Sequence, residues 1–217
     1  MSTLRSSRSP NLSNAAQVYQ PQFFDQVFRQ FRVYFNEIDN FLSNISGPYG
    51  GDYLTFSYGS FYDTTDQTAA NTTTAYAVSF NSTDISQQVS IASSSQITFD
   101  VAGTYNIQFS IQLSNSTNDT QDVDIWFRLN GSNSANSNSR YGLPARKSSG
   151  DPSHTIAVVN FLIAVAVGDY VQIMWRPSDT GVKIEYHSTS ATPDRPAVPS
   201  AIVTVTRVSA PAPNIYG

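Results

Sequence analysis

The chain has 217 residues, a formal net charge of −4 and a sequence pI of about 4.9, which together argue against the basic surface of a nucleic-acid-binding protein. It contains no cysteine, so disulfide scaffolds and thiolate metal sites are excluded. Only 13% of the residues are charged and 12% are aromatic, so we expect one main domain with a polar, weakly charged surface and a short appendage.

The N-terminal segment, residues 1–20, is rich in Ser, Asn and Gln and shows no hydrophobic periodicity. We predict an extended arm, which either docks onto a larger assembly or is an unattached terminus. The first eight residues lack the apolar core of a secretory signal. The longest apolar run, residues 161–167, is far shorter than the roughly 20 residues of a membrane-spanning helix. We therefore expect a soluble protein made in a cytoplasm, with no membrane insertion.

A helix is predicted over residues 21–47, because large apolar side chains recur there in alternating four- and three-residue steps. Pro21 suits a first helical turn, and Gly47 followed by Pro48 favours termination. The predicted oligomerisation or anchor stripe consists of Phe24, Phe28, Phe31, Phe35, Ile38, Leu42 and Ile45. This stripe is compatible with a three-helix bundle on a trimer axis, with docking into another particle protein, or with folding back onto the rest of the chain.

After a turn-rich linker at residues 48–52, every predicted element up to residue 209 is a strand, and residues 210–217 form a C-terminal tail. The predicted strands are 53–62, 76–80, 89–91, 97–113, 121–129, 156–167, 170–175, 182–187 and 201–208. Residues 63–73 and 130–155 are predicted loops. About ten short strands without a second helix indicate an all-β fold, a two-sheet antiparallel jelly-roll sandwich over residues 53–209.

Residues 97–113 give the clearest strand signal, because apolar side chains occupy the odd positions and polar side chains nearly all the even ones. Gly103 interrupts this run. It predicts either two antiparallel strands or one sharply bent strand, since glycine relaxes the limits on backbone geometry.

The predicted strand 156–167 is apolar on both faces, unlike the others. One face of a single antiparallel sandwich sheet should be solvated, so we infer that a second copy of the chain covers the other face. Phe161, Ile163 and Val165 are the candidate residues for this homo-oligomer interface.

Several of these segments resemble known protein families. Phe99, Ala102, Gly103, Tyr105 and Phe109, followed by the segment 167–171, resemble the signature of complement-type and tumour necrosis factor-type jelly rolls. Segments 60–67, 123–128, 160–161, 174–175 and 195–200 are similar to a module of bacteriophage structural and fibre proteins. The resemblance covers residues 53–209 and implies a homotrimer on a virion surface.

Few residues suggest catalysis or metal binding. The chain has two histidines, His154 and His187. His154 has Asp151 nearby in sequence, but no nucleophile elbow accompanies this pair, so His154 is interpreted as a surface-loop residue. Asp119, Asp122 and Asp124 lack calcium-loop spacing, and Arg128 offers Asp124 a simpler charge partner. We therefore predict no enzyme, no catalytic residue, no metal site and no cofactor.

Candidate host-binding residues cluster in the long polar segment 130–155: Arg140, Tyr141 and Arg146. Trp126 and Trp175 are alternatives, because exposed tryptophans stack on sugar rings, although burial is the commoner fate of a strand tryptophan.

The sequence thus favours a non-enzymatic phage virion protein, a trimeric capsid decoration, head fibre or short tail-fibre component anchored by its N-terminal segment. Its expected partners are copies of itself, other virion proteins of the capsid or tail, and a host-surface glycan. The alternative is a tail-associated receptor- or glycan-binding adhesin.

Overall fold

The computed structural model of the protein describes residues 18, 20–46 and 56–209, with side chains in the helix described up to residue 42. The predicted linker 48–52, the predicted tail 210–217, residues 53–55 and all but two residues of the predicted arm 1–20 lie outside this part. The chain divides into two compact units, Met1–Thr55 and Phe56–Gly217. Each unit is described by itself.

The N-terminal unit contains the predicted helix, α1, which spans Pro21–Ser46. The Gln20 carbonyl accepts hydrogen bonds from the backbone N–H groups of Phe23, at 3.0 Å, and Phe24, at 3.5 Å, which starts the helix where proline is best tolerated. None of the described helices is long and apolar enough to span a membrane.

The helix leaves large apolar side chains of its stripe in contact with solvent. Phe28 is 63% exposed and Phe35 is 56% exposed, although the Phe31 and Phe35 rings stack at 6.4 Å. An amphipathic helix gains most of its stability from packing of its apolar face. The stripe is therefore a surface suited to packing against another protein surface.

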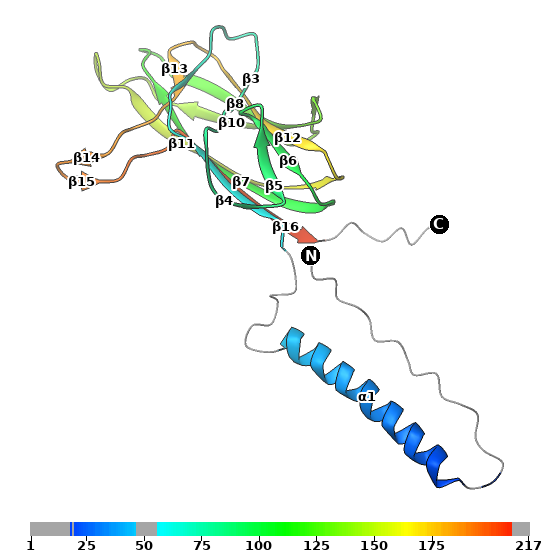
Figure 1. Cartoon of the computed structure of the whole chain (residues 1–217). Helices are drawn as coiled ribbons and strands as arrows, with labels where there is room; N and C mark the ends of the chain where they lie inside the picture. The colour runs from blue at the N-terminus through cyan, green and yellow to red at the C-terminus, as the bar shows by residue number, and fades with distance from the viewer. Residues whose placement is uncertain (1–17, 19, 47–55, 210–217) are drawn as a thin grey trace. The chain divides into compact units, whose positions relative to one another are not determined.

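The C-terminal unit is all-β, as predicted, and its described strands form two antiparallel sheets (Figure 1). The first sheet runs β4 (Ser82–Gln87), β1 (Tyr58–Asp63), β16 (Ala201–Ser209), β7 (Gly103–Asn115) and β11 (Ser153–Val165), with β13 (Val182–Ile184) and β2 (Gln67–Thr68) beside one end of β7. The second sheet runs β10 (Ser139–Leu143), β8 (Gln121–Leu129), β12 (Tyr170–Pro177), β6 (Gln96–Phe99) and β5 (Val89–Ala92), with β3 (Tyr76–Ala77) on β12 and β9 (Ser132–Asn133) on β8. A hairpin of β14 (Ser190–Ala191) and β15 (Asp194–Arg195) projects away from both sheets.

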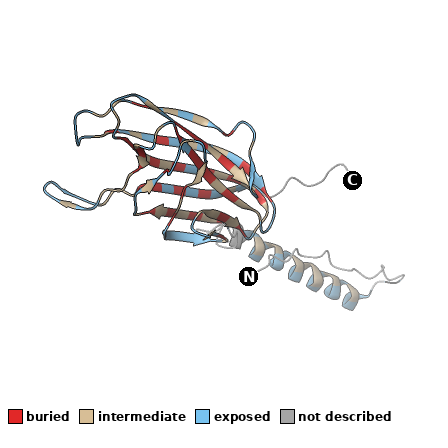
Figure 2. Ribbon diagram, turned by 90° about the horizontal axis from the view of Figure 1, so that it is seen from above, coloured by how far each residue is buried: buried red, intermediate tan, exposed pale blue. Residues whose placement is uncertain are grey.

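The two sheets bury one hydrophobic core between them. Buried and exposed positions alternate along the strands, as Figure 2 shows, and the odd residues of β7 face the core as predicted. Aromatic rings join the sheets: Phe109 of β7 lies 5.8 Å from Phe127 of β8, which in turn stacks at 5.0 Å on Phe161 of β11. This packing fixes the outward direction of the remaining side chains, which form the two outer faces.

Gly103 does separate two strands, but these strands do not pair with each other. β6, before the break, belongs to the second sheet, and β7, after it, belongs to the first. A Cβ atom on Gly103 would lie 2.5 Å from the Ser209 carbonyl oxygen and 2.6 Å from Arg207 Nε, so glycine permits the close approach of β16. The break is therefore a crossing between sheets and not a hairpin or a bend.

The predicted loop 130–155 was too long. It contains β9 and β10, and β11 already begins at Ser153. β10 pairs with β8 in register, Arg140 opposite Asp124 and Tyr141 opposite Val123. Its Ser, Arg and Gly residues lack the apolar alternation that reveals a strand, which is why the pattern concealed it.

Candidate functional site

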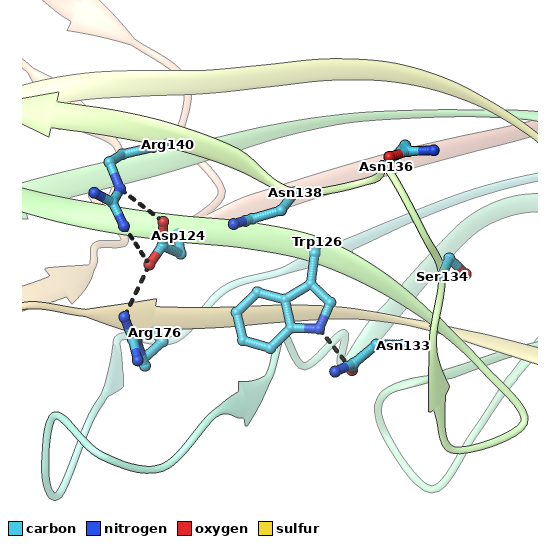
Figure 3. A pocket seen from close by; sticks show the side chains of 8 residues that line it. All are labelled: Asp124, Trp126, Asn133, Ser134, Asn136, Asn138, Arg140 and Arg176. Carbon is cyan, nitrogen blue, oxygen red and sulfur yellow. Dashed lines mark hydrogen bonds and ion pairs between the residues drawn. The ribbon is translucent and has the colours of Figure 1, made fainter.

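A polar pocket of ≈ 430 Å³ lies on the outer face of the second sheet (Figure 3). It is lined by residues of β8, β9, β10 and β12 and of the segment joining β9 to β10: Asp124, Trp126, Asn133, Ser134, Asn136, Asn138, Arg140 and Arg176. The even positions of β8 point outward, because its odd positions from Val123 to Phe127 are buried in the core.

One wall of the pocket is a row of three charges on neighbouring strands. Arg140 of β10 and Arg176 of β12 lie directly opposite Asp124 on either side of β8. Arg140 Nε donates to Asp124 Oδ1 at 2.9 Å and its terminal nitrogen donates to Oδ2 at 3.3 Å, while Arg176 donates to Oδ2 at 3.0 Å. The hydrogen bond from Arg140 is the main cause of a lowered pKa at Asp124, and it raises the pKa of Arg140. This row is ionised and orients both guanidinium groups.

Trp126 occupies the middle of the pocket. Its indole N–H donates to Asn133 Oδ1 at 2.8 Å, and the same oxygen accepts a hydrogen bond from Arg128 Nε at 3.1 Å. The β9–β10 connection is fixed by Ser137, whose hydroxyl accepts from the Phe127 N–H at 3.0 Å. Figure 3 shows the indole between the charged row and the asparagine-rich segment. The ring is half-buried and held in place before any ligand arrives.

The chemistry of this pocket suits a ligand rich in hydroxyl groups. A preset aromatic face offers apolar contact, while amides and guanidinium groups offer hydrogen bonds around it. Glycoside hydrolysis uses two carboxyl groups on either side of the scissile bond. Asp124 is the one carboxylate lining the pocket, and two arginines already engage it. The pocket therefore lacks the carboxylate pair of a glycosidase among its lining residues.

The three candidate host-binding residues fall in different places. Arg140 lines the pocket. Tyr141 points the other way from the strand, packs against the core and donates its hydroxyl to the Val158 carbonyl of β11 at 2.9 Å. Burial raises the pKa of the Tyr141 phenol. Arg146 lies outside the pocket, where its backbone N–H donates to the Thr117 carbonyl at 2.9 Å.

The two tryptophans have different roles. Trp175 is 1% exposed and packs on Tyr76 at a ring distance of 6.0 Å, so the prediction of burial holds for it. Trp126 is the tryptophan that lines the pocket. Arg176 and Asn133, which also line the pocket, were not predicted as site residues from the sequence. Arg176 had a usable signal, since it occupies an outward position of a strand whose alternate residues are strongly apolar.

The outer face of the first sheet is apolar along β11. Ile156, Val158 and Leu162 are 56–60% exposed and stand on the even, outward positions of the strand. Val158 also lines a shallow hollow of ≈ 280 Å³, which it shares with Ile202 of β16. Within the described residues β11 pairs only with β7, so it is an edge strand as well as an apolar one.

The candidate interface residues Phe161, Ile163 and Val165 lie on the opposite, inward side of β11. Phe161 stacks on Phe127, and Ile163 and Val165 belong to the buried core. The sequence pattern thus correctly predicted that β11 has an apolar face on each side. The face available to a neighbouring molecule is the one with Ile156, Val158 and Leu162.

His154 was expected in a surface loop but lies on a strand, and the predicted strand 182–187 ends before His187, at Ile184. His154 lies on β11 and faces Glu185, with 3.3 Å between its Nδ1 and Oε2, while Asp151 instead approaches Lys147 at 3.8 Å. His187 forms an isolated bridge with Val198. Asp124 was expected to face Arg128, but its partners are Arg140 and Arg176.

Models of known protein families do not match this chain, and no curated protein is similar to it.

Proposed function

We propose that the protein is a non-enzymatic structural component of a bacteriophage particle, a trimeric β-sandwich joined to the particle through its N-terminal helix. A capsid decoration, head fibre or short tail fibre fits this description. The proposal rests on the sequence segments that resemble phage virion modules. The observation that carries it is that α1 and β11 each expose a row of apolar side chains.

The strand order supports a jelly-roll assignment for the sandwich. One sheet contains the order β1–β16–β7–β11 and the other β6–β12–β8–β10, so among these eight strands the chain changes sheet at every step except from β8 to β10. Two sheets connected in this way are the arrangement of a double Greek key. The resemblance to complement-type and tumour necrosis factor-type domains rests on the same strands.

The occupant of the β11 face is a second copy of the chain. Val158 and Leu162 stand beside Ser110 and Asn106 of β7, which are polar but uncharged, so a neighbour would leave no ionised group buried along this row. The helix stripe favours self-association in the same way, because its four- and three-residue steps are those of a helical bundle. A virion protein that docks through one end can use both surfaces.

Sedimentation equilibrium of the full chain tests the trimer. The expected mass is three times 23.7 kDa at micromolar concentration. A species of 23.7 kDa at that concentration would contradict the proposal. Antibody labelling of intact particles then separates the roles: label over the head identifies a decoration or head fibre, and label on the tail identifies an attachment protein.

A second function, glycan binding by an adhesin, is favoured by the pocket around Trp126. The ring is preset and the surrounding groups are amides and guanidinium groups. We expect the protein to bind host-envelope polysaccharide and Trp126→Ala to weaken that binding by roughly two- to tenfold, from a loss of about 0.5–1.5 kcal/mol of ring contact.

Arg146→Ala is the matched control for that measurement, because it removes a half-buried arginine that does not line the pocket. Equal losses in the two variants would place the binding elsewhere. If wild-type protein binds none of a panel of host polysaccharides, only the architectural function stands.

A further inference from the structure

Three side chains with metal-binding chemistry converge at one end of the first sheet. His154 projects from the outward face of β11, where it lies opposite Ser114 of β7. Glu185 directly follows β13, and its backbone N–H donates to the Gln112 carbonyl of β7 at 2.9 Å. His187 is held two residues later by its hydrogen bonds with Val198. Strand pairing therefore positions all three residues, although 33 positions separate the first from the last.

The spacing of the potential ligand atoms is close to that of a tetrahedral site. His154 Nδ1 lies 3.3 Å and His187 Nε2 lies 3.7 Å from Glu185 Oε2, and all three ligand atoms lie within 4.8 Å of one another. Bonds of about 2.0–2.2 Å to a tetrahedral zinc ion put its ligand atoms roughly 3.3–3.5 Å apart. The two histidine rings are 5.6 Å apart in an edge-to-face arrangement.

Glu185 presents its two oxygens to different neighbours. Oε1 lies 3.0 Å from Lys183 Nζ, and that ammonium group also donates to Asp66 Oδ2 at 2.8 Å. Oε2 is buried and, within the described part of the chain, has no hydrogen-bond partner. A simple imidazolium–carboxylate pair would aim an N–H at this oxygen. Here Oε2 of the Glu185 carboxylate, which Lys183 holds by its other oxygen, lies close to a nitrogen of each imidazole, as ligands around an ion do.

We propose that His154, Glu185 and His187 bind a zinc ion. Two imidazole nitrogens and one carboxylate oxygen form a ligand set that zinc accepts, with a fourth position left for water or a further ligand. His154 and His187 are 41% and 39% exposed at their side chains, so an ion can enter from solvent. Lys183 acts as a positioning residue, because it fixes the orientation of the Glu185 carboxylate.

The site has a structural consequence for the fold. A zinc ion would join β11 to the segment after β13, from which the β14–β15 hairpin extends (Figure 1). A ligand that binds only the folded chain stabilises it. Zinc is therefore expected to raise the unfolding temperature as well as to bind.

Isothermal titration of the full, untagged chain after chelator treatment tests the site, with zinc chloride as the probe. The chain has only two histidines, both in this cluster, so a histidine tag would hide the result. We expect one zinc ion per chain and a rise in unfolding temperature. When cobalt replaces zinc, we expect a visible spectrum that indicates coordination by imidazole. His154→Asn, His187→Asn and Glu185→Gln should each abolish binding at zinc concentrations that saturate the wild type.

Asp84→Asn is the matched control, because it removes an exposed carboxylate from β4 of the same sheet and should retain full binding. Circular dichroism of each variant verifies folding. The proposal is overturned if the wild-type chain shows no binding with millimolar zinc, or if zinc still binds one-to-one to the double variant His154→Asn, His187→Asn. Bound cobalt whose visible spectrum shows no coordination by imidazole would overturn it equally.

Discussion

The two outer faces of the sandwich come from strands of the same kind, yet their chemistry differs. Along β11 of the first sheet, the outward positions carry Ile156, Val158 and Leu162. Along β8 of the second sheet, the outward positions carry Asp124 and Trp126, with arginines from both neighbouring strands. Each β-strand offers one face to the core, so these outer positions are where selection can act without disturbing the fold.

This difference suits the two faces to different proposed tasks, self-association and ligand binding. An uncharged apolar face is suited to permanent contact with another copy, since it buries apolar area without stranding a charge. A preset polar pocket is suited to a reversible contact with a ligand that water also solvates well. The comparison therefore predicts that substitutions on one face leave the property of the other face unchanged.

The largest effect is expected from charges placed on the apolar face. Val158→Asp with Leu162→Asp should convert the proposed trimer into monomers, because burying an unpaired carboxylate costs several kcal/mol. Sedimentation velocity reports the assembly state, and polysaccharide binding should survive. Ala135→Asp, an exposed change in the β9–β10 connection of the other face, is the control and should remain trimeric. Dissociation by both variants would mean that the faces do not divide the tasks.

A smaller effect, a loss of stability that does not distinguish the two faces, is expected at Gly103, where the chain crosses from one sheet to the other. Gly103→Ala places a Cβ atom 2.5 Å from the Ser209 carbonyl oxygen and should destabilise the fold by about 1–3 kcal/mol, the usual cost of overpacking. The midpoint of urea unfolding measures this loss. Gly142→Ala is the control, because the nearest atom to its added Cβ is a side-chain oxygen at 3.8 Å. An unchanged midpoint for Gly103→Ala would show that β16 can shift without cost.

The smallest effect is expected at Asp124 and depends on pH. Arg140 and Arg176 lower the Asp124 pKa below its ordinary value of 3.8, so its ionised form stabilises the fold. This contribution is fully present above the unfolded-state pKa and disappears as the pH falls through the lowered folded-state pKa. Asp124→Asn should therefore be less stable than wild type at neutral pH, and the two should converge once the pH falls below the lowered pKa of Asp124 in the folded state.

Urea unfolding at several pH values checks this convergence. Asp122→Asn is the control, since Asp122 is an exposed neighbour on the same strand outside the charged row. A stability difference between Asp124→Asn and wild type that stays constant down to the lowest pH would contradict the electrostatic explanation. The loss of stability in Asp124→Asn can then be compared with the loss of assembly in the variant of the apolar face.

The strands with strong alternation could be predicted from local sequence alone. β7 and β8 show a period of two because each has one face in the core, and α1 shows its four- and three-residue steps. β10 was missed because its outer positions are polar and its inner ones include Ser139 and Tyr141. The move from β6 into the other sheet was also missed, because Gly103 signals a break but not the partner that each strand finds.

The sites were harder to predict because they depend on strand register. Asp124 is 16 positions from Arg140 and 52 from Arg176, and only the pairing of β10, β8 and β12 brings them together. His154 and Glu185 meet for the same reason, on either side of β7. Local patterns identify which side chains point outward, whereas the neighbours of an outward side chain are set by topology.

The place of β16 also decides when this domain can fold. Residues 201–209 form the strand between β1 and β7, and its pairing with β1 connects residues more than 130 positions apart. During synthesis, β1 and β7 lack their shared neighbour until nearly all of the sandwich has been made. Such long-range pairing slows folding and leaves strand edges open to other chains. We therefore expect the domain to complete its folding only after residues 201–209, its central strand, have been made.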